Sequence, residues 1–350
     1  MKYNREIRGF PCVIVIVILA VAPTMTYAAE RIMVSFSNLA YPFFVYMQRV
    51  AEDEAQKLGV KLIIQDGQGN SPKQSADVEV ALVQGVDAIL IAPNDVSALV
   101  PAVNEVLKEG VPIMTLDRRV DHPVRPVHHV GVDNVAGGRA MAKWIIDNYP
   151  DGATLVHLTG QPGSSTAQDR ARGTREGLAK GGKKKYRILA DQTANWSRAE
   201  GLTVTKSILI ALEEPPDLII GSCDDMAFGA IEAIDSVGLK DAGIRVIGYD
   251  ALPEALSKVR DGVLSATVEQ EPGLQVRTAL RVMTEHLRTG KPLRTVIVKP
   301  FVIEKHNVHK AERIGEVKEK DEKGKRKGNK KKGDGTAMLD RSLWVRCYGC

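Results

Sequence analysis

Charged and polar side chains come directly after apolar runs at several points of this 350-residue sequence. Asp117 and Arg118 follow one run, Asp250 closes a second, and Gln270 follows a third. A carboxylate only accepts hydrogen bonds, arginine only donates them, and glutamine does both. Asp117 beside Arg118 could therefore hold two adjacent hydroxyl groups of a ligand, because each hydroxyl both donates and accepts. The structural alternative is that the pair forms an ion pair or caps a loop.

Aromatic residues make up 5% of the sequence, yet several lie together after the first apolar run. Tyr41, Phe43 and Phe44 stand where a helix is expected to begin. Adjacent positions on a helix point in different directions, so we expect one phenylalanine to face a ligand and the other the core. Trp196 lies in a loop between a predicted strand and a predicted helix. We expect it to be exposed and to form a flat wall for an apolar ring face.

Several motifs that an enzyme would need fail in detail. The glycines of 66-DGQGNSP-72 do not fit a dinucleotide loop, because a proline occupies the third glycine position. The segment 160-GQPGSST-166 lacks the Gly-Lys-Ser/Thr of a phosphate loop. His128 and His129 would point to opposite faces of a strand and could not act together. We therefore predict that the chain is not an enzyme and needs no cofactor or metal.

The elements that position these residues alternate between apolar, β-rich runs and amphipathic helical patterns. Continuous Val/Ile/Leu runs bounded by Gly, Asp and Pro are typical of parallel strands covered on both faces. Two such series predict an α/β fold of two doubly wound parallel-sheet lobes, with ligands bound at the carboxyl ends of the strands. The expected strands are 32–37, 60–66, 87–92, 111–117, 153–158, 185–190, 217–222 and 245–250, and the expected helices are 43–58, 72–84, 97–109, 135–148, 166–179, 198–212 and 225–237.

Residues 1–28 have the features of a secretory signal peptide. Basic residues precede the apolar run 13–22, and small residues up to Ala28 fit a cleavage site. The run is shorter than the roughly 20 residues of a membrane-spanning helix, so we expect cleavage after Ala28 rather than a membrane anchor. The sequence gives no disulfide framework, since Cys223 is the one cysteine between the signal peptide and the C-terminal pair Cys347 and Cys350.

The formal net charge of +5 arises from the ends of the chain. Residues 318–350 carry a net +6 and residues 1–28 a net +2, which leaves residues 29–317 with a net charge of −3. A mildly acidic body gives no reason to expect a nucleic-acid partner. Lysine-rich runs are usually solvated, so we predict a charged, disordered tail over 306–350.

Eight short motifs, in their order and spacing behind a signal peptide, resemble those of bacterial periplasmic sugar-binding proteins of ABC transporters, in particular the ribose-binding group. The resemblance covers about residues 31–304. Its motifs are 42-PFF-44, 66-DGQGNSPKQ-74, 115-TLDRR-119, 131-GVDNVAGG-138, 163-GSSTAQDRARG-173, 224-DDMAFGA-230, 246-VIGYD-250 and 266-ATVEQEP-272.

This resemblance implies the type I periplasmic binding protein fold, in which a three-segment hinge joins two lobes that close on one sugar. The implied first lobe comprises 29–131 and 271–299, and the second comprises 132–270 and 300–305. The chain would cross between them near 131–133, 270–272 and 298–300. The implied ligand-binding residues are Tyr41, Phe43, Phe44, Asp117, Arg118, Gln168, Arg170, Trp196, Cys223, Asp224, Asp250 and Gln270, and the family match favours Phe44 as the aromatic wall.

The chain departs from the ribose-binding pattern at three polar positions. Tyr41 and Cys223 stand where that pattern has asparagine, and Gln168 stands where it has arginine, although Arg170 follows closely. A binding site rejects ligands that leave its own buried polar groups unpaired, so these changes should alter specificity. Ribose itself is therefore disfavoured, and another pentose, a hexose, a sugar alcohol or a cyclitol remains open.

The resemblance implies the substrate-binding component of an ABC-type sugar importer, a monomer in the periplasm that delivers a sugar or polyol to a membrane permease and its ATPase. An alternative is a periplasmic sensor subunit that presents sugar to a chemoreceptor or sensor kinase through the same cleft. A sugar-responsive repressor has a similar two-lobed domain but needs an N-terminal DNA-binding helix-turn-helix. Here that region is an apolar export signal, which argues against nucleic-acid binding.

Overall fold

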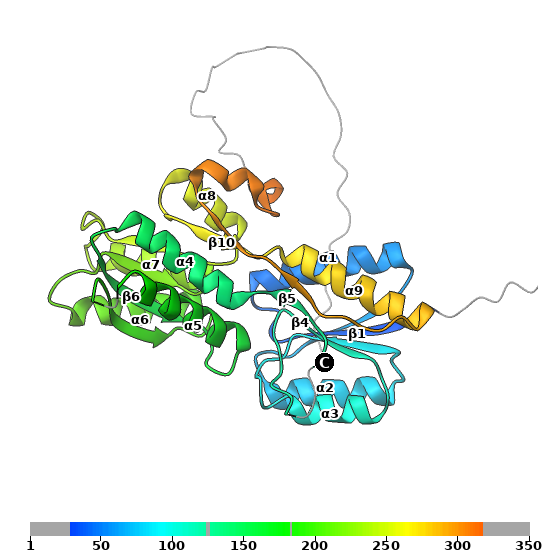
Figure 1. Ribbon diagram of the computed structural model, residues 1–350. Coiled ribbons are helices and arrows are strands. Elements are labelled where there is room, and N and C mark those ends of the chain that lie inside the picture. The colour runs from blue at the N-terminus through cyan, green and yellow to red at the C-terminus, as the bar shows by residue number, and fades with distance from the viewer. Residues whose placement is uncertain (1–28, 124–126, 183, 318–350) are drawn as a thin grey trace, which may run out of the picture.

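Parallel strands form two separate sheets, each with helices on both faces (Figure 1). The computed structural model describes residues 29–123, 127–182 and 184–317. The predicted signal peptide and residues 318–350 of the predicted tail lie outside the described residues. The α/β class with two parallel-sheet lobes is confirmed by the architecture below.

The first lobe is built on a sheet with the strand order β11-β5-β4-β3-β1-β2, in which all neighbouring strands are parallel. Helices α1 and α9 cover one face, and α2 and α3 cover the other (Figure 1). The bounds are β1 (Arg31–Phe36), α1 (Pro42–Leu58), β2 (Lys61–Asp66), α2 (Ser71–Val83), β3 (Ala88–Ile91), α3 (Val100–Lys108), β4 (Ile113–Leu116), β5 (His129–Val132), α9 (Pro272–Thr289) and β11 (Val296–Val298).

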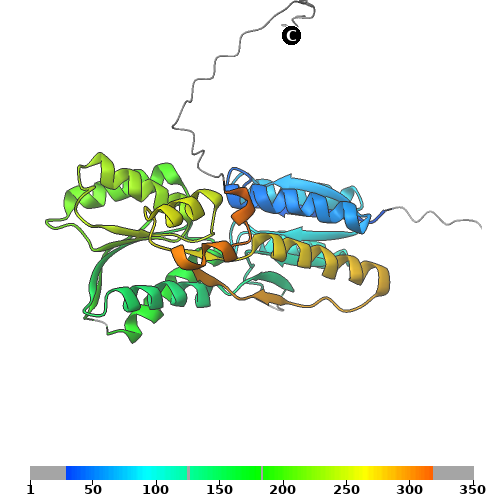
Figure 2. The same ribbon diagram turned by 90° about the horizontal axis from the view of Figure 1, so that it is seen from above.

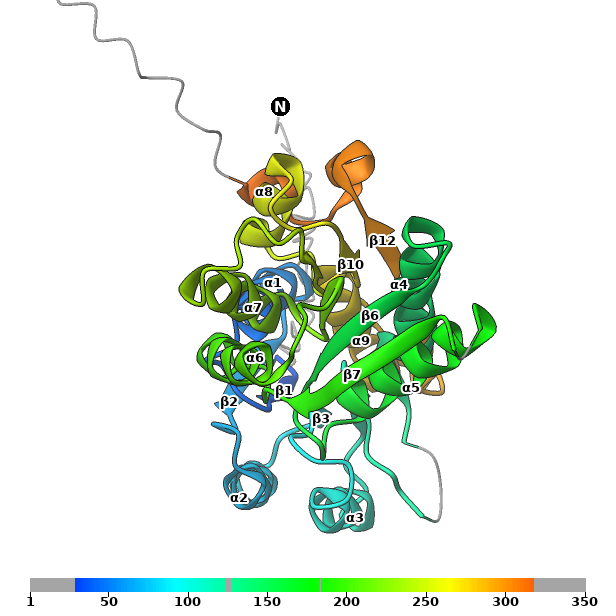
Figure 3. The same ribbon diagram turned by 90° about the vertical axis from the view of Figure 1, so that its left-hand side faces the viewer.

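The second lobe is built on a parallel sheet of order β7-β6-β8-β9. Helices α4 and α5 pack on one face, and α6, α7 and α8 pack on the other (Figure 3). The bounds are α4 (Asn134–Asn148), β6 (Ala153–Thr159), α5 (Ser165–Lys180), β7 (Tyr186–Thr193), α6 (Arg198–Ala211), β8 (Leu218–Gly221), α7 (Asp224–Ser236), β9 (Arg245–Ile247) and α8 (Pro253–Asp261). A short antiparallel ribbon of β10 (Thr267–Glu269) and β12 (Phe301–Ile303) lies beside it.

The chain passes between the lobes at three places within the described residues. These are the links from β5 to α4, from β10 to α9 and from β11 to β12. They coincide with the three predicted crossings. We propose that they form the hinge, with the lobe boundaries that the sequence suggests.

Local sequence explains where several helices begin and end. Pro42 is in the first turn of α1, where its missing N–H costs nothing, and Gly59 ends the helix at a φ of 68°. Asp133 caps α4 by accepting a hydrogen bond from the backbone N–H of Ala136 at 2.9 Å. Because this cap lies at the first crossing, α4 begins directly at the interface between the lobes.

One part of the predicted tail is wrong. Residues 306–317 are folded, in the 3-10 helices η1 (Lys305–Lys310) and η2 (Ile314–Glu316), which lie between the two lobes in Figure 2. Ala311 is buried there against Ile303 and Leu256. The small apolar residues of this segment are too widely spaced to stand out in a charged sequence.

Among the described residues, no helix is long and apolar enough to span a membrane, and no cluster of His, Cys, Asp and Glu could hold a metal ion.

Candidate ligand-binding site

A cavity lies between the lobes, at the carboxyl ends of their strands. Both lobes supply its walls. Its lining residues are Tyr41, Phe43, Phe44, Asp117, Arg118, Thr166, Arg170, Trp196, Cys223, Asp225, Asp250 and Gln270. Ten of the twelve predicted site residues are therefore brought together here.

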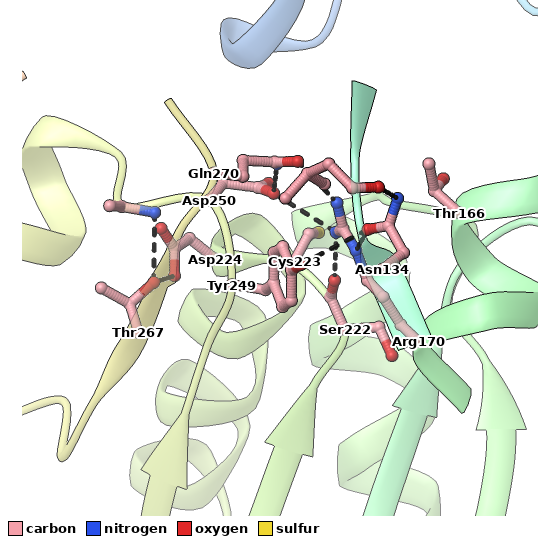
Figure 4. A network of polar contacts seen from close by, with 12 residues as sticks. Asn134, Thr166, Arg170, Ser222, Cys223, Asp224, Tyr249, Asp250, Thr267 and Gln270 are labelled. Atoms are coloured by element: carbon pink, nitrogen blue, oxygen red, sulfur yellow. Dashed lines mark hydrogen bonds and ion pairs between the residues drawn. The ribbon is translucent and has the colours of Figure 1, made fainter. Parts of the chain in front are cut away.

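Arg170 is the centre of a buried hydrogen-bond network on the second-lobe side of the cavity (Figure 4). Its Nε donates to Asn134 Oδ1 at 2.8 Å, and its Nη1 donates to the carbonyl oxygen of Ser222 at 2.7 Å. Nη1 also lies 3.3 Å from Asp250 Oδ1, and Nη2 donates to Gln270 Oε1 at 3.2 Å. With its donors occupied in this way, the guanidinium is held in one orientation.

Two glycines allow the helix that carries Arg170 to approach its neighbour closely. A Cβ at Gly138 of α4 would lie 2.3 Å from the carbonyl oxygen of Arg170, and one at Gly173 of α5 would lie 2.1 Å from that of Val135. Any larger residue would push α4 and α5 apart. On its other side, the Arg170 guanidinium stacks 3.6 Å from the ring centroid of Tyr249, a cation–π contact. The position of Arg170 is thus set by backbone packing as well as by polar contacts.

Asp250 faces the cavity from the end of the second-lobe sheet in an uncommon backbone conformation. Its φ is 113°, a region that non-glycine residues rarely adopt and that is concentrated at functional sites. Gln270 Nε2 donates to its Oδ1 at 2.6 Å. Burial raises the pKa of the Asp250 carboxyl to about 7, opposed by the nearby charges of Arg170 and Arg313.

Asp117 and Arg118 form the opposite wall, where they lie at ion-pair distance from each other but leave several polar atoms without hydrogen bonds among the described residues. Both are at most 4% exposed, and Asp117 has a φ of 60°. Arg118 Nε lies 3.9 Å from Asp117 Oδ2, beyond hydrogen-bond distance. Asp117 Oδ1, Arg118 Nε and Arg118 Nη1 are buried without a hydrogen-bond partner among the described residues. Burial raises the pKa of Asp117 and lowers that of Arg118, and the charge of each residue opposes this effect on the other.

Aromatic rings close the cavity between these two polar walls. Arg118 Cζ lies 5.4 Å from the ring centroid of Phe44 and 5.8 Å from that of Trp196. Phe43 and Phe44 meet edge to face at 5.3 Å, and both line the cavity, as in the residue set implied by the resemblance, although helix geometry alone suggested that one would face the core. Trp196 was expected to be exposed but is 6% exposed, with a φ of 65°. Its ring also lies 5.4 Å from Arg170 Cζ, so two guanidinium groups contact it.

Two of the three residues that depart from the ribose-binding pattern, Tyr41 and Cys223, line the cavity. Tyr41 donates from its hydroxyl to the carbonyl oxygen of Asn195 at 3.4 Å, a contact between the lobes. Cys223 caps α7, with its Sγ accepting from the backbone N–H of Met226 at 3.5 Å. Burial raises the pKa of the Cys223 thiol well above its usual range, so it stays protonated.

Two predicted residues do not reach the cavity. Gln168 is exposed and donates to the carbonyl oxygen of Pro162 at 3.0 Å, because two positions along α5 separate it from Arg170 by more than half a turn. Asp224 is fully buried behind the cavity, where its carboxylate accepts hydrogen bonds from the Leu252 N–H at 2.8 Å and the Thr267 hydroxyl at 2.7 Å (Figure 4). Asp224 is therefore a structural residue that joins α7 to α8 and β10.

Two residues that the sequence prediction omitted line the cavity instead. Thr166 lies one helical turn before Arg170 on α5, a spacing that places both on one face and could have identified it. Asp225 is adjacent to Asp224, and burial raises its pKa to about 6. The sequence offers no signal for which of these two neighbouring carboxylates faces the cavity.

Contacts across the cleft show that the lobes are closed. The backbone N–H of Val96 donates to the carbonyl oxygen of Gly163 at 2.9 Å. Arg119 bonds through its N–H to Ser165 Oγ at 2.9 Å and through Nη1 to Asp169 Oδ2 at 2.6 Å. Residues next to the cavity thus pair directly between the two lobes.

Two parallel-sheet lobes, joined by three crossings and enclosing a polar, aromatic-walled cavity, define a two-lobed ligand-binding protein. The comparisons with known proteins specify the family. Residues 32–292 match the periplasmic binding protein domain, and the chain belongs to that family, as a sugar-binding protein of the ribose-binding-like, type I group.

Relatives show the range of ligands in this group. The ribose import binding protein RbsB of Bacillus subtilis is 39% identical over 272 residues, which cover 77% of this chain and 85% of RbsB. A Caulobacter myo-inositol binding protein, solved with myo-inositol bound, is 47% identical with a TM-score of 0.80, covering 82% of this chain and 97% of that one. A solute binding protein from Bacillus halodurans, also with bound myo-inositol, is 27% identical with a TM-score of 0.75, covering 80% and 96%.

Proposed function

We propose that this chain is the periplasmic substrate-binding component of an ABC importer and that its ligand is a cyclitol, with myo-inositol as the first candidate. The observation that supports this most is the pair of walls: on one lobe, charged groups have polar atoms without hydrogen bonds among the described residues, and they face an ordered acceptor and donor network on the other lobe. A neutral ring that carries hydroxyls around its whole edge can bond to both walls at once. The aromatic rings suit its apolar faces.

Within this proposal, the residues divide by the chemistry that they offer. Asp117 and Asp250 accept hydrogen bonds from ligand hydroxyls, and Arg118 donates hydrogen bonds to those hydroxyls. Gln270 can do both. Phe43, Phe44 and Trp196 stack on the ring. We assign Asp225 and Thr166 to the site in place of Asp224 and Gln168.

The comparisons favour a cyclitol over a pentose. The identity with the myo-inositol binding protein is 47%, against 39% with RbsB. Tyr41 and Cys223 replace two asparagines of the ribose-binding pattern with side chains that offer fewer amide hydrogen bonds. A ligand that relied on those amides would leave hydroxyls unpaired.

Closure supplies the mechanism. Only the closed form contacts a ligand from both lobes, so the ligand favours closure by its differential affinity for the two states. Micromolar binding requires about 8 kcal/mol, which several charge-assisted hydrogen bonds and ring stacking can supply in a site shielded from water. The closed protein then delivers the ligand to the permease, whose ATPase provides the energy of transport.

The test is a thermal-shift screen of the purified protein against myo-inositol, its stereoisomers, ribose, allose and sorbitol, followed by calorimetric titration. A ligand present at 1,000 times its Kd adds about 4 kcal/mol of stability, so we expect the myo-inositol midpoint to rise by on the order of 10 °C. A larger shift with ribose would overturn the cyclitol assignment. No shift with any polyol would overturn the proposed function.

A further inference from the structure

The segment after β12 is anchored to the second lobe. Ala311 is buried with Ile303 and Leu256 in a small apolar cluster, and Ile314 packs against the same cluster. Glu304 begins η1 and accepts a hydrogen bond from Trp144 Nε1 of α4 at 2.9 Å. Residues 305–317, which we call the C-terminal strap, lie beyond the region matched by the family.

The C-terminal strap also bonds to first-lobe helices. Glu312 accepts from the Gly273 N–H at 2.8 Å, and from Arg277 Nη2 at 2.6 Å, both on α9. Glu316 pairs with Arg49 of α1. The strap therefore contacts both lobes, and Figure 2 shows it beside the first-lobe helix α1.

Arg313, in the middle of the strap, is buried directly behind the ligand cavity. It is 1% exposed, and its Nη2 donates to the backbone carbonyl oxygen of Asp250. Its Cζ lies 5.2 Å from the ring centroid of Tyr46, on first-lobe helix α1. One guanidinium thus touches a cavity-lining residue of the second lobe and an aromatic ring of the first.

The surroundings of Arg313 explain why a cation is buried there. Its charge acts on the buried carboxylates Asp224, Asp225, Asp250 and Glu269, lowering the pKa of each against the effect of burial. Among these, Asp250 also faces Arg170 and Asp117, and Glu312 approaches Glu269. Without Arg313, Arg170 would be the main positive charge that lowers the pKa of Asp250 against the effect of burial.

We propose that Arg313 is a positioning residue of the ligand site, which holds Asp250 in its uncommon backbone conformation and in its ionised, hydrogen-bond-accepting form when the lobes are closed. This inference rests on the proposed function, because it requires a polyol that bonds to Asp250. Arg313 does not touch the cavity itself. It acts by its hydrogen bond to the Asp250 carbonyl oxygen and by its positive charge near the Asp250 carboxylate. Its contact with Tyr46 couples its position to that of the first lobe.

The experiment measures myo-inositol affinity by calorimetry between pH 5 and pH 8 for the full chain and its variants. Arg313→Met removes the charge and the donors at similar length, Arg313→Lys keeps the charge, and Lys310→Met is an exposed control on the same strap. We expect Arg313→Met to lose affinity about tenfold or more, as for one charge-assisted hydrogen bond. Lys310→Met should bind as the wild type does.

The pH profile distinguishes positioning from general stability. Because an ionised Asp250 accepts from the ligand, affinity should fall as pH drops through the pKa of Asp250. Arg313 lowers that pKa, so Arg313→Met should move the midpoint of this loss to higher pH, and Arg313→Lys should restore it. An Arg313→Met profile equal to that of the wild type would overturn the inference.

Two further outcomes of this experiment, a variant that does not fold and a wild type that does not bind, also have a defined meaning. If Arg313→Met does not fold, Arg313→Lys and Tyr46→Leu provide the test: each should bind several-fold more weakly than the wild type, and wild-type affinity in both would overturn the inference. If the wild type itself binds no polyol in the same buffers, the proposed function fails rather than the role of Arg313.

Discussion

On the second-lobe side of the cavity, Arg170, Asp250 and Gln270 bond to one another and to their own lobe, whereas on the first-lobe side Asp117 and Arg118 leave three buried polar atoms without partners among the described residues. The two walls contain the same kinds of side chain. They differ in whether those side chains are already satisfied. One wall is organised before the ligand arrives, and the other is completed by it.

This difference indicates which wall contributes mainly to the stability of the folded protein and which mainly to ligand binding. A satisfied buried network rigidifies its surroundings and belongs to the stability of the lobe. Buried charged groups that lack hydrogen bonds lower the stability of the ligand-free protein. That stability is regained when a ligand supplies the missing hydrogen bonds. We therefore expect substitutions on the two walls to reduce binding alike but to change the stability of the ligand-free protein differently.

The largest effect is expected from Arg170→Ala. Removing this guanidinium leaves Asp250, Gln270 and Asn134 without their shared donor, so the free energy of unfolding should fall by about 3–5 kcal/mol, as when one member of a buried ion pair is deleted. Binding should be lost as well. Urea denaturation and calorimetry measure both. The control is Arg172→Ala, two residues along α5, whose side chain is 59% exposed; equal destabilisation by both variants would contradict the assigned network.

Asp117→Ala should abolish binding with little effect on the ligand-free protein. Loss of hydrogen bonds to an ionised acceptor, each worth about 1.5–3 kcal/mol, should weaken affinity by about 100-fold or more. The unfolding midpoint without ligand should change little, because relief of the burial cost of the Asp117 carboxylate offsets the loss of its 3.9 Å ion pair with Arg118. Calorimetry and thermal denaturation test this, with the exposed Asp121→Ala as the control. A marked fall in the ligand-free midpoint would show that Asp117 is structural.

The sequence predicted the fold and most of the first-lobe wall for the same physical reason. Asp117 and Arg118 follow an unbroken buried strand, β4, and the end of a parallel strand has a known direction relative to the cleft. Asp250 and Gln270 follow shorter apolar runs at corresponding places. These positions depend on local pattern and topology, which a single sequence contains.

The remaining positions depend on contacts between distant residues. Asp224 and Asp225 are neighbours at the start of α7, and the hydrogen bonds from Leu252 and Thr267 decide which of them is buried. The C-terminal strap is similar, since its burial depends on Ala311 meeting residues of α8 and β12. The local sequence around two adjacent aspartates, or within a charged segment, does not reveal these distant partners.

The pH dependence of stability should also report on the second-lobe wall. Burial raises the pKa of Asp225 to about 6 and that of Asp250 to about 7, so both favour the folded state below about pH 4, where they are protonated in either state. This contribution is lost as pH rises through about 6 to 7. Compared with the wild type, Asp250→Asn should therefore gain several degrees in ligand-free midpoint between pH 5 and pH 8, measured by thermal denaturation. A constant difference across this range would contradict the raised pKa.

The smallest effect is expected from Cys223→Ser. Serine is a better helix cap than cysteine, but its hydroxyl is more costly to bury, so the free energy of unfolding should change by no more than about 1 kcal/mol. Affinity for myo-inositol should change less than tenfold. Chemical denaturation and calorimetry measure both quantities. A loss of binding as large as that of Asp117→Ala would mean that Cys223, rather than the first-lobe wall, dominates recognition.

The most direct test is a crystal structure of the protein with myo-inositol at a resolution that shows the orientation of each hydroxyl. We expect the ring between Phe44 and Trp196, with Asp117 Oδ1 and Arg118 Nε and Nη1 bonded to ligand hydroxyls and the contacts of Arg170 unchanged. A ligand bound elsewhere, or one that leaves those three first-lobe atoms unpaired, would contradict the account.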